Sequence, residues 1–179
     1  MQKRIAFLTC VVLTLSILAT AQMGGGKQRP SPAASAQCKF ADGKSIKVNY
    51  SSPRAKGRKI YGELVPFGEV WRTGANEATT FDTDANLTIE GKEVPAGNYT
   101  IFTLPNQDKW QLIINKKTGE WGIPYKYESD ELGRFNMSVS KTPAPVEDFT
   151  ISFHEMGDGC HMYMDWENTR ASMEISEKK

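Results

Sequence analysis

An alternation of apolar and polar residues with a period of two constrains the fold of this chain more than any other feature. The alternating apolar positions are Ile46, Val48 and Tyr50; Leu87 and Ile89; Trp110, Leu112 and Ile114; Phe135, Met137 and Val139; Phe149, Ile151 and Phe153; Met162, Met164 and Trp166; and Ala171, Met173 and Ile175. Each run places its apolar side chains on one face of a half-buried β-strand. No stretch of a dozen residues shows helical periodicity. The sequence therefore predicts an all-β fold: a single antiparallel β-sandwich, jelly-roll or Ig-like, with one long irregular connection.

Turn-forming residues between the runs allow the pairing of the two strands in one hairpin to be predicted. If residues 158–159 form a two-residue turn, Phe153 faces Met164 and Ile151 faces Trp166. All large apolar groups of the hairpin then share one face, whereas a three-residue turn would mix the faces. The sequence predicts the two-residue turn.

The only two histidines of the chain lie in the same hairpin. The predicted register places His154 and His161 on the face away from the core, on a diagonal of roughly 7–8 Å. Glu155, Asp158 and Asp165 are nearby in the sequence and raise the alternative of a metal site. Their spacing matches no established set of ligands, because a metal site needs three or four converging groups. We therefore expect no metal.

The first residues are typical of an export signal. Lys3 and Arg4 precede an uncharged run over residues 5–20, and Ala19 and Ala21 suit a signal peptidase. The run is shorter than the roughly 20 residues that span a bilayer. The expected organisation is a signal peptide at 1–21, a flexible linker rich in Gly, Pro, Ser and Ala at 22–37, and the folded domain at 38–179, in the periplasm or outside the cell.

The net charge of the chain narrows the class of possible partners. The formal net charge is +1, and no basic run is present, so nucleic acid is excluded as a partner.

Cys10 lies in the signal, which leaves Cys38 and Cys160 in a chain bound for an oxidising compartment. Cys38 shares its parity with Phe40, and Cys160 with Met162, so both thiols should point inward. The sequence predicts a disulfide between them.

The long connection at residues 51–77 lacks clean alternation and gathers cations. Loops of this length inside a compact domain are uncommon unless they are functional or disordered. Its basic residues could hold a carboxylate, phosphate or sulfate through paired hydrogen bonds, and Trp71 and Tyr61 could add a stacking surface. A solvated loop is the alternative for the cluster that comprises Arg54, Lys56, Arg58 and Lys59. The ligand-binding candidates are Arg54, Arg58, Trp71, Arg72, Asn76 and Glu77.

Residues 70–81, VWRTGANEATTF, have a structural interpretation that needs no ligand. A buried Arg is tolerated when it is paired, and Glu77 follows Arg72 across a turn. An Arg72–Glu77 ion pair would pin the loop, with Trp71 packed on the core. In the binding interpretation, Arg72 instead opens onto a concave surface beside the other cations of the connection.

Six stretches of the chain form a recognisable pattern: RPSPAA (29–34), YSSPRAKGR (50–58), LVPFGEVWRTGANEATTF (64–81), VPAGNYTIFTLP (94–105), WQLIIN (110–115) and EWG (120–122). These stretches resemble a family of exported bacterial proteins known as domain of unknown function 2911. The resemblance covers residues 29–175 and implies an exported protein but no particular activity. Its signature falls on Pro53, Arg54, Gly57, Arg58, Trp71, Arg72, Gly74, Asn76 and Glu77.

These observations favour a non-catalytic binding or structural module of the bacterial cell envelope, with residues 51–77 as its recognition surface. The partner would be a small anionic or carbohydrate ligand, or an envelope protein. The alternative is a glycan-directed hydrolase or lyase in which Glu77 is the general acid or base and Arg72 holds an anionic group. A general acid needs a raised pKa, and pairing with Arg72 would lower the pKa of Glu77. A second carboxylate beside Glu77, from Asp82 or Asp84, would favour the enzyme. We expect no cofactor, and membrane contact only through the signal segment during export.

Overall fold

A computed structural model describes residues 29–179, and the chain in this range is almost entirely β-structure. All strand pairs are antiparallel, and the nine strands form one sheet in the order β1-β2-β3-β6-β7-β8-β9-β4-β5. The elements are β1 (Ala33–Lys39), β2 (Ser45–Ser51), β3 (Thr79–Thr83), β4 (Leu87–Ile89), β5 (Lys92–Val94), β6 (Gly97–Leu104), β7 (Lys109–Asn115), a 3₁₀ turn η1 (Glu128–Asp130), β8 (Glu131–Met156) and β9 (Gly159–Glu177). The all-β prediction is confirmed.

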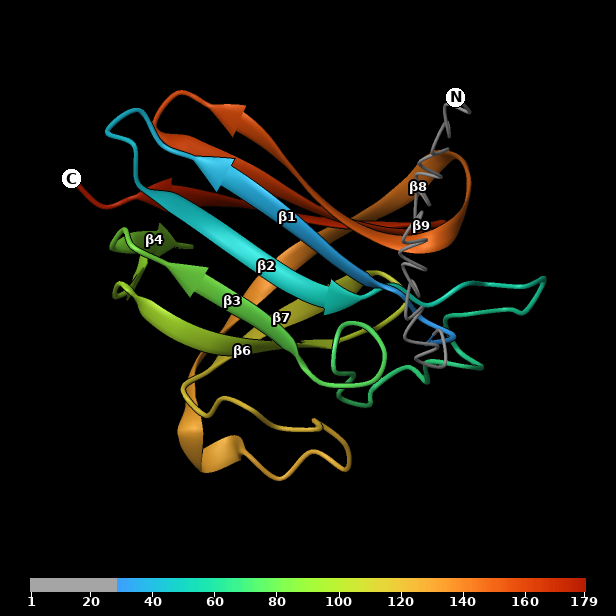
Figure 1. The fold of residues 1–179 in the computed structure, drawn as a ribbon. Coiled ribbons are helices and arrows are strands. Elements are labelled where there is room, and N and C mark those ends of the chain that lie inside the picture. The colour runs from blue at the N-terminus through green and yellow to red at the C-terminus, as the bar shows by residue number, and fades with distance from the viewer. Residues whose placement is uncertain (1–28) are drawn as a thin grey trace, which may run out of the picture.

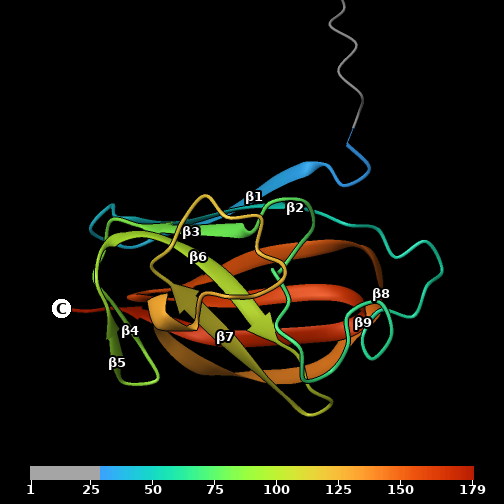
Figure 2. The same cartoon turned by 90° about the horizontal axis from the view of Figure 1, so that it is seen from below.

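The sheet curls so that its two halves face each other across the core (Figure 1). Seen from below, β1, β2 and β3 lie in one layer and the long strands β8 and β9 lie in the other (Figure 2). The alternating positions of the sequence meet between them: Phe81, Leu112 and Trp166 are each at most 1% exposed. Burial of this apolar surface, at roughly 25 cal/mol per Å², is the main term that holds the layers together.

The hairpin of β8 and β9 is longer than expected and differs in register. The runs at 135–139 and 149–153, which read as separate strands, belong to one 26-residue strand, β8. Its turn lies one residue earlier than predicted, so Ile151 faces Met164 and Phe153 faces Met162. The predicted register is therefore wrong by two residues. Because a shift of two preserves parity, the apolar side chains still share one face.

The two histidines are direct cross-strand partners instead of diagonal neighbours. His154 is exposed, and the ring of His161 stacks on Tyr163 with centroids 4.5 Å apart. Within residues 29–179, no three His, Cys, Asp or Glu side chains converge in a way that could hold a metal ion.

The expected linker at 22–37 runs too far into the chain. Residues 33–37 belong to β1, which pairs with β2 over seven positions from Ala33↔Ser51 to Lys39↔Ser45. The sequence did not predict β1 because the stretch has small residues and no alternation of large apolar side chains. As an edge strand, β1 pairs with one neighbour and buries few large side chains. The expected signal at 1–21 lies outside the described residues, and no helix within residues 29–179 is long and apolar enough to cross a membrane.

A disulfide joins Cys38 in β1 to Cys160 in β9, as predicted from their parity. The two Cα atoms are 6.3 Å apart, and both residues are fully buried. The bridge closes a sequence separation of 122 residues, so it ties the first strand to the last. Constraining an unfolded chain over so long a loop contributes about 2–4 kcal/mol.

A second, smaller core covers the outer face of β6 and β7. Phe102 and Ile113 point away from the main core and are buried under the segment between β7 and β8, where Tyr125 and Tyr127 pack on Phe102. With Trp110, Leu112 and Ile114 facing the main core, Ile113 falls on the opposite face of its strand, where a polar residue is expected. An isoleucine at that position indicates that another segment covers this face.

Candidate functional site

The connection between β2 and β3 is fastened to the sheet at both ends. Near its start, the N–H of Ala55 donates to the carbonyl of Glu147 (2.8 Å) and the N–H of Phe149 donates to the carbonyl of Pro53 (2.9 Å). Near its end, Trp71 and Thr103 of β6 exchange two backbone hydrogen bonds of 2.8 and 2.9 Å. These bonds hold the intervening loop at one end of the curled sheet.

The indole of Trp71 packs on the main core, as the structural interpretation expected. It stacks on Trp166 with centroids 5.8 Å apart and an angle of 17°, and it meets the edge of Phe149 at 4.9 Å. The Trp71 Nε1–H donates to the carbonyl of Gly74 (3.1 Å), and the Trp166 Nε1–H donates to that of Glu147 (3.1 Å). Both indoles have therefore used their only hydrogen-bond donor.

Tyr61 cannot supply the ligand-stacking surface suggested by the sequence, because it is 6% exposed and wedged between Trp71 and Trp110. Its Oη is buried without a hydrogen-bond partner among the described residues. Burial raises the pKa of this phenol, and the negative charges of Glu167 and Asp165 add to the effect. The hydroxyl therefore stays protonated.

A tight turn after Arg72 positions the end of the connection. Thr73 has a φ of 57°, Gly74 of 156° and Asn76 of 59°. A β-branched residue at positive φ is strained. The surrounding structure keeps Thr73 in this conformation, because the residue is fully buried and its carbonyl accepts a hydrogen bond from the Thr79 hydroxyl at 2.7 Å. A Cβ on Gly74 would lie 2.9 Å from the carbonyl oxygen of Ser51, so the turn requires glycine there.

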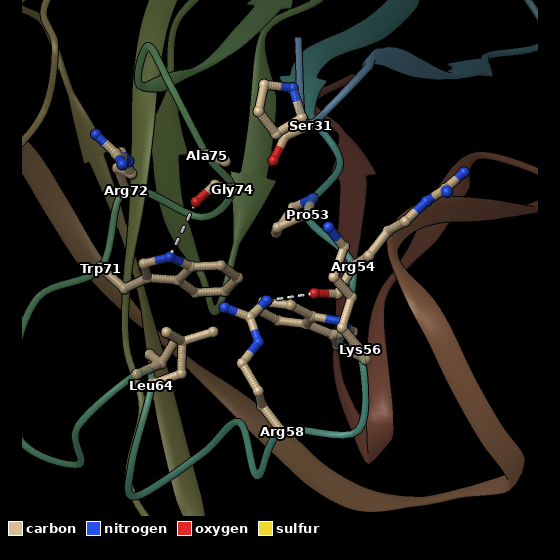
Figure 3. Close-up of a pocket in the computed structure, with 13 residues that line it drawn as sticks. Ser31, Pro53, Arg54, Lys56, Arg58, Leu64, Trp71, Arg72, Gly74 and Ala75 are labelled. Carbon is tan, nitrogen blue, oxygen red and sulfur yellow. Dashed lines mark hydrogen bonds between the residues drawn. The ribbon is translucent and has the colours of Figure 1, made fainter.

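These elements enclose a groove of about 360 Å³ (Figure 3). The connection supplies most of its wall, the leading segment before β1 supplies one rim, and β9 supplies Trp166. The lining residues are Pro30, Ser31, Pro53, Arg54, Lys56, Arg58, Leu64, Val65, Trp71, Arg72, Gly74, Ala75 and Trp166. Of the six ligand-binding candidates, the structure brings Arg54, Arg58, Trp71 and Arg72 together in this groove.

The groove carries more positive than negative charge. Arg54 pairs with Asp148 (Nε to Oδ1, 2.9 Å), and this is the only ion pair made by a groove cation within residues 29–179. Arg58 instead donates from Nε to the carbonyl of Ala55 (2.9 Å), and from one Nη to that of Arg54. These neutral acceptors orient the guanidinium without cancelling its charge, so the groove is electropositive.

Arg72 does not form the predicted ion pair with Glu77. Its guanidinium lies over the ring of Trp121, 5.4 Å from the centroid, and one Nη is 3.5 Å from the Trp121 carbonyl oxygen. Burial lowers the pKa of Arg72, and the charge of Glu77 opposes that shift. A guanidinium nevertheless remains charged at any physiological pH.

Glu77 and Asn76 face the leading segment and do not line the groove. Glu77 Oε2 accepts from an Nη of Arg29 at 2.8 Å, and Asn76 Nδ2 donates to the carbonyl of Ser31 at 3.2 Å. The Arg72–Glu77 pair failed as a prediction because residues 29–32, assigned to the flexible linker, supply the partner of Glu77. The two candidates therefore hold the rim of the groove in place.

The electrostatics of Glu77 do not suit a general acid. Its own backbone N–H, followed by Arg29, holds the pKa of the Glu77 carboxyl below its ordinary value, and half of the side chain is exposed. Asp82 accepts from Asn49, and Asp84 accepts from the backbone N–H of Ser45. Neither converges on Glu77.

A family model described as "Protein of unknown function (DUF2911)" matches residues 31–175. The chain belongs to this family. Comparison with curated proteins and with solved structures gives no match. The signature noted in the sequence of this DUF2911 member divides by position: one group lines the groove and another holds its rim. The first group is Pro53, Arg54, Arg58, Trp71, Arg72 and Gly74, the second is Asn76 and Glu77, and Gly57 belongs to neither.

Sequence reasoning missed four contributors to the site in this DUF2911 chain. Trp166 was assigned to the core alone, and Pro30 and Ser31 were assigned to the linker. The RPSPAA stretch was a usable signal, because its resemblance to the family extended upstream of the predicted domain boundary. Leu64, 46% exposed in the groove wall, was not named as a candidate either, although it begins the resembling stretch LVPFGEVWRTGANEATTF (64–81).

Proposed function

We propose that the chain is an exported, non-catalytic binding module of the bacterial cell envelope, and that the groove lined mainly by the connection at residues 51–77 takes a small anionic or carbohydrate ligand. The observation that carries this proposal is the charge of the groove. Four cationic side chains line it, and one of them, Arg54, has a carboxylate partner among the described residues. Concave sites with a few fixed polar groups are the usual form of a small-molecule site.

A binding role is favoured over a glycan-directed hydrolase or lyase by the chemistry of the lining. Among the described residues that line the groove there is no carboxylate, histidine, cysteine or tyrosine. The candidate acid or base, Glu77, lies outside it and has a lowered pKa. General acid–base catalysis needs a titratable group within hydrogen-bond reach of the reacting atom. Arg72 supplies charge but no proton transfer, and Lys56, the only lysine among the described lining residues, has no carboxylate or histidine in that lining to act as its partner.

Export to the periplasm or the cell exterior is part of the same proposal. It is supported by the signal-like pattern of residues 1–21 and by the buried disulfide, a bond typical of oxidising compartments. We also propose to class the curled sheet as a β-sandwich of the jelly-roll or Ig-like type. The support is its two layers around one core (Figure 2).

A thermal-shift screen tests the proposed function. The chain, expressed with its leader and purified from the exported fraction, is heated with sulfate, phosphate, organic acids and neutral sugars. A ligand that binds the native state alone raises the melting temperature. The rise should disappear in Arg58→Ala and persist in Lys59→Ala, which removes an adjacent charge that lies outside the groove and pairs with Glu63. No rise with any compound, or equal rises in both variants, would reject the groove as a binding site.

A further inference from the structure

We propose that the ligand of the groove is an oxyanion, such as a carboxylate, attached to a small apolar or aromatic group, and that it is not a neutral sugar. This inference rests on the proposed function and narrows its ligand class. Three properties of the groove lead to it: its excess of positive charge, its apolar wall and its scarcity of side-chain acceptors.

The cationic side favours an oxyanion with a geometry that guanidinium groups can match. Arg58 is held by two backbone carbonyls, so part of its fork is fixed before any ligand arrives. Arg54, Lys56 and Arg72 also line the groove. In Figure 3 the guanidinium of Arg58 lies beside Trp71, whereas the side chains of Arg54 and Arg72 extend away from it. Guanidinium groups bind carboxylate, phosphate and sulfate through paired, charge-assisted hydrogen bonds. At Arg58 an anion would therefore meet preformed donors, whereas at Arg54 it would compete with Asp148.

The other side of the groove offers apolar contact and no hydrogen bonds. Trp71 has committed its indole N–H to a backbone carbonyl, so only its ring remains for a ligand. Leu64 is 46% exposed beside it, and the half-buried Pro53 completes the accessible apolar surface, while the buried Trp166 and Val65 support it from behind. Removing such surface from water is favourable, and it requires an apolar part in the ligand.

A neutral sugar would find few partners in this lining. Sugar hydroxyls must donate as well as accept, and a buried hydroxyl without an acceptor loses affinity. Among the described lining residues, the hydroxyl of Ser31 is the only side-chain acceptor, and the carbonyls of Arg54 and Gly74 already accept from Arg58 and Trp71. The volume of about 360 Å³ is near the lower end for small-molecule sites, so it suits one ring with its acidic group.

Matched probes separate the two halves of the proposed ligand. Isothermal titration calorimetry compares phenylacetate with acetate, which lacks the ring, with 2-phenylethanol, which lacks the charge, and with glucose. Phenylacetate should bind at least tenfold more tightly than acetate, and the two neutral compounds should give no measurable binding. Arg58→Ala should weaken phenylacetate at least tenfold. Leu64→Ser should weaken phenylacetate while leaving acetate unchanged, and Lys59→Ala should bind all probes as the wild type does.

The outcomes distinguish this inference from the proposed function. If glucose or 2-phenylethanol binds at least as tightly as phenylacetate, the anionic ligand is wrong although the groove remains a binding site. If acetate and phenylacetate bind equally and Arg58→Ala weakens both, the groove binds anions but its apolar wall does not select them, which overturns the inference. If neither these probes nor the broader screen shows binding, the proposed function and this inference fail together.

Discussion

The substitution Arg72→Ala distinguishes two roles of this side chain: ligand binding in the groove, and an ion pair that holds the loop in place. Arg72→Ala deletes the guanidinium that lies 5.4 Å from the ring centroid of Trp121, together with the weak 3.5 Å contact to the Trp121 carbonyl. It leaves Glu77 paired with Arg29, so no charge is stranded without its partner.

The expected loss of stability is small because each lost contact is weak. A cation–π contact at a partly exposed site is worth about 0.5–1 kcal/mol. A hydrogen bond at 3.5 Å is at the limit of the interaction and adds little. The free energy of unfolding should therefore fall by about 1 kcal/mol. Breaking a buried Arg72–Glu77 pair would instead have cost roughly 3–5 kcal/mol.

Urea denaturation at neutral pH measures this difference. With a denaturant slope of about 1–3 kcal/mol per M, the midpoint of Arg72→Ala should move by about 0.3–1 M, with the slope unchanged. Trp71→Ala provides the contrast, because it empties a position packed between Trp166 and Phe149 and should cost about 3–5 kcal/mol. Arg72→Ala should also lose the ligand response of the groove.

A fall of 3 kcal/mol or more in Arg72→Ala would refute this reasoning. It would mean that the guanidinium holds the loop closed through contacts stronger than those to Trp121, and the groove would lose one of its cations as a ligand-binding group.

Four further changes should have defined outcomes. Cys160→Ala should lower the free energy of unfolding by about 2–5 kcal/mol in urea without reductant, and adding reductant should change the wild type but not the variant. Gly74→Ala should lower the melting temperature by several degrees, since its Cβ would lie 2.9 Å from a backbone oxygen of β2, and a wild-type value would contradict that geometry. The hydrogen bond from Arg134 lowers the pKa of Glu131, so it adds stability that is lost as the pH falls below about 4.5, and Glu131→Gln should flatten this acid dependence in pH-dependent urea titrations. Stoichiometric zinc should leave the melting temperature unchanged, whereas a rise that vanished in His154→Ala would establish a metal site.

Local periodicity predicted most strands but not their length or neighbours. The stretch 142–146, TPAPV, reads as a break between strands because of its two prolines. In the structure β8 continues through it with register shifts between Lys141 and Val146 and again before Thr150. The pairing of β3 with β6 and of β4 with β9 joins strands that are distant in sequence. Such pairing depends on how whole faces pack, and no local pattern encodes it.

The sequence predicted which residues line the site better than it predicted which of them contact each other. Clustered cations in one connection indicated a concave surface, and Arg54, Arg58 and Arg72 do line one groove. The partner of Glu77 was misassigned because sequence proximity favoured Arg72, five residues away, over Arg29, 48 residues away. A charged side chain finds its partner through the fold, so spacing in a loop is poor evidence for an ion pair.

The pairing of β4 with β9 makes one edge of the sheet depend on a contact between distant parts of the chain. Thr88 lies opposite Ser176, and Leu87 lies opposite Glu177. Within residues 29–179, β4 pairs with β5 and β9 alone, so the short β4–β5 hairpin has no sheet to join until β9 is in place. Because closing so long a loop costs more conformational entropy than closing a local hairpin, we expect this edge to form late in folding.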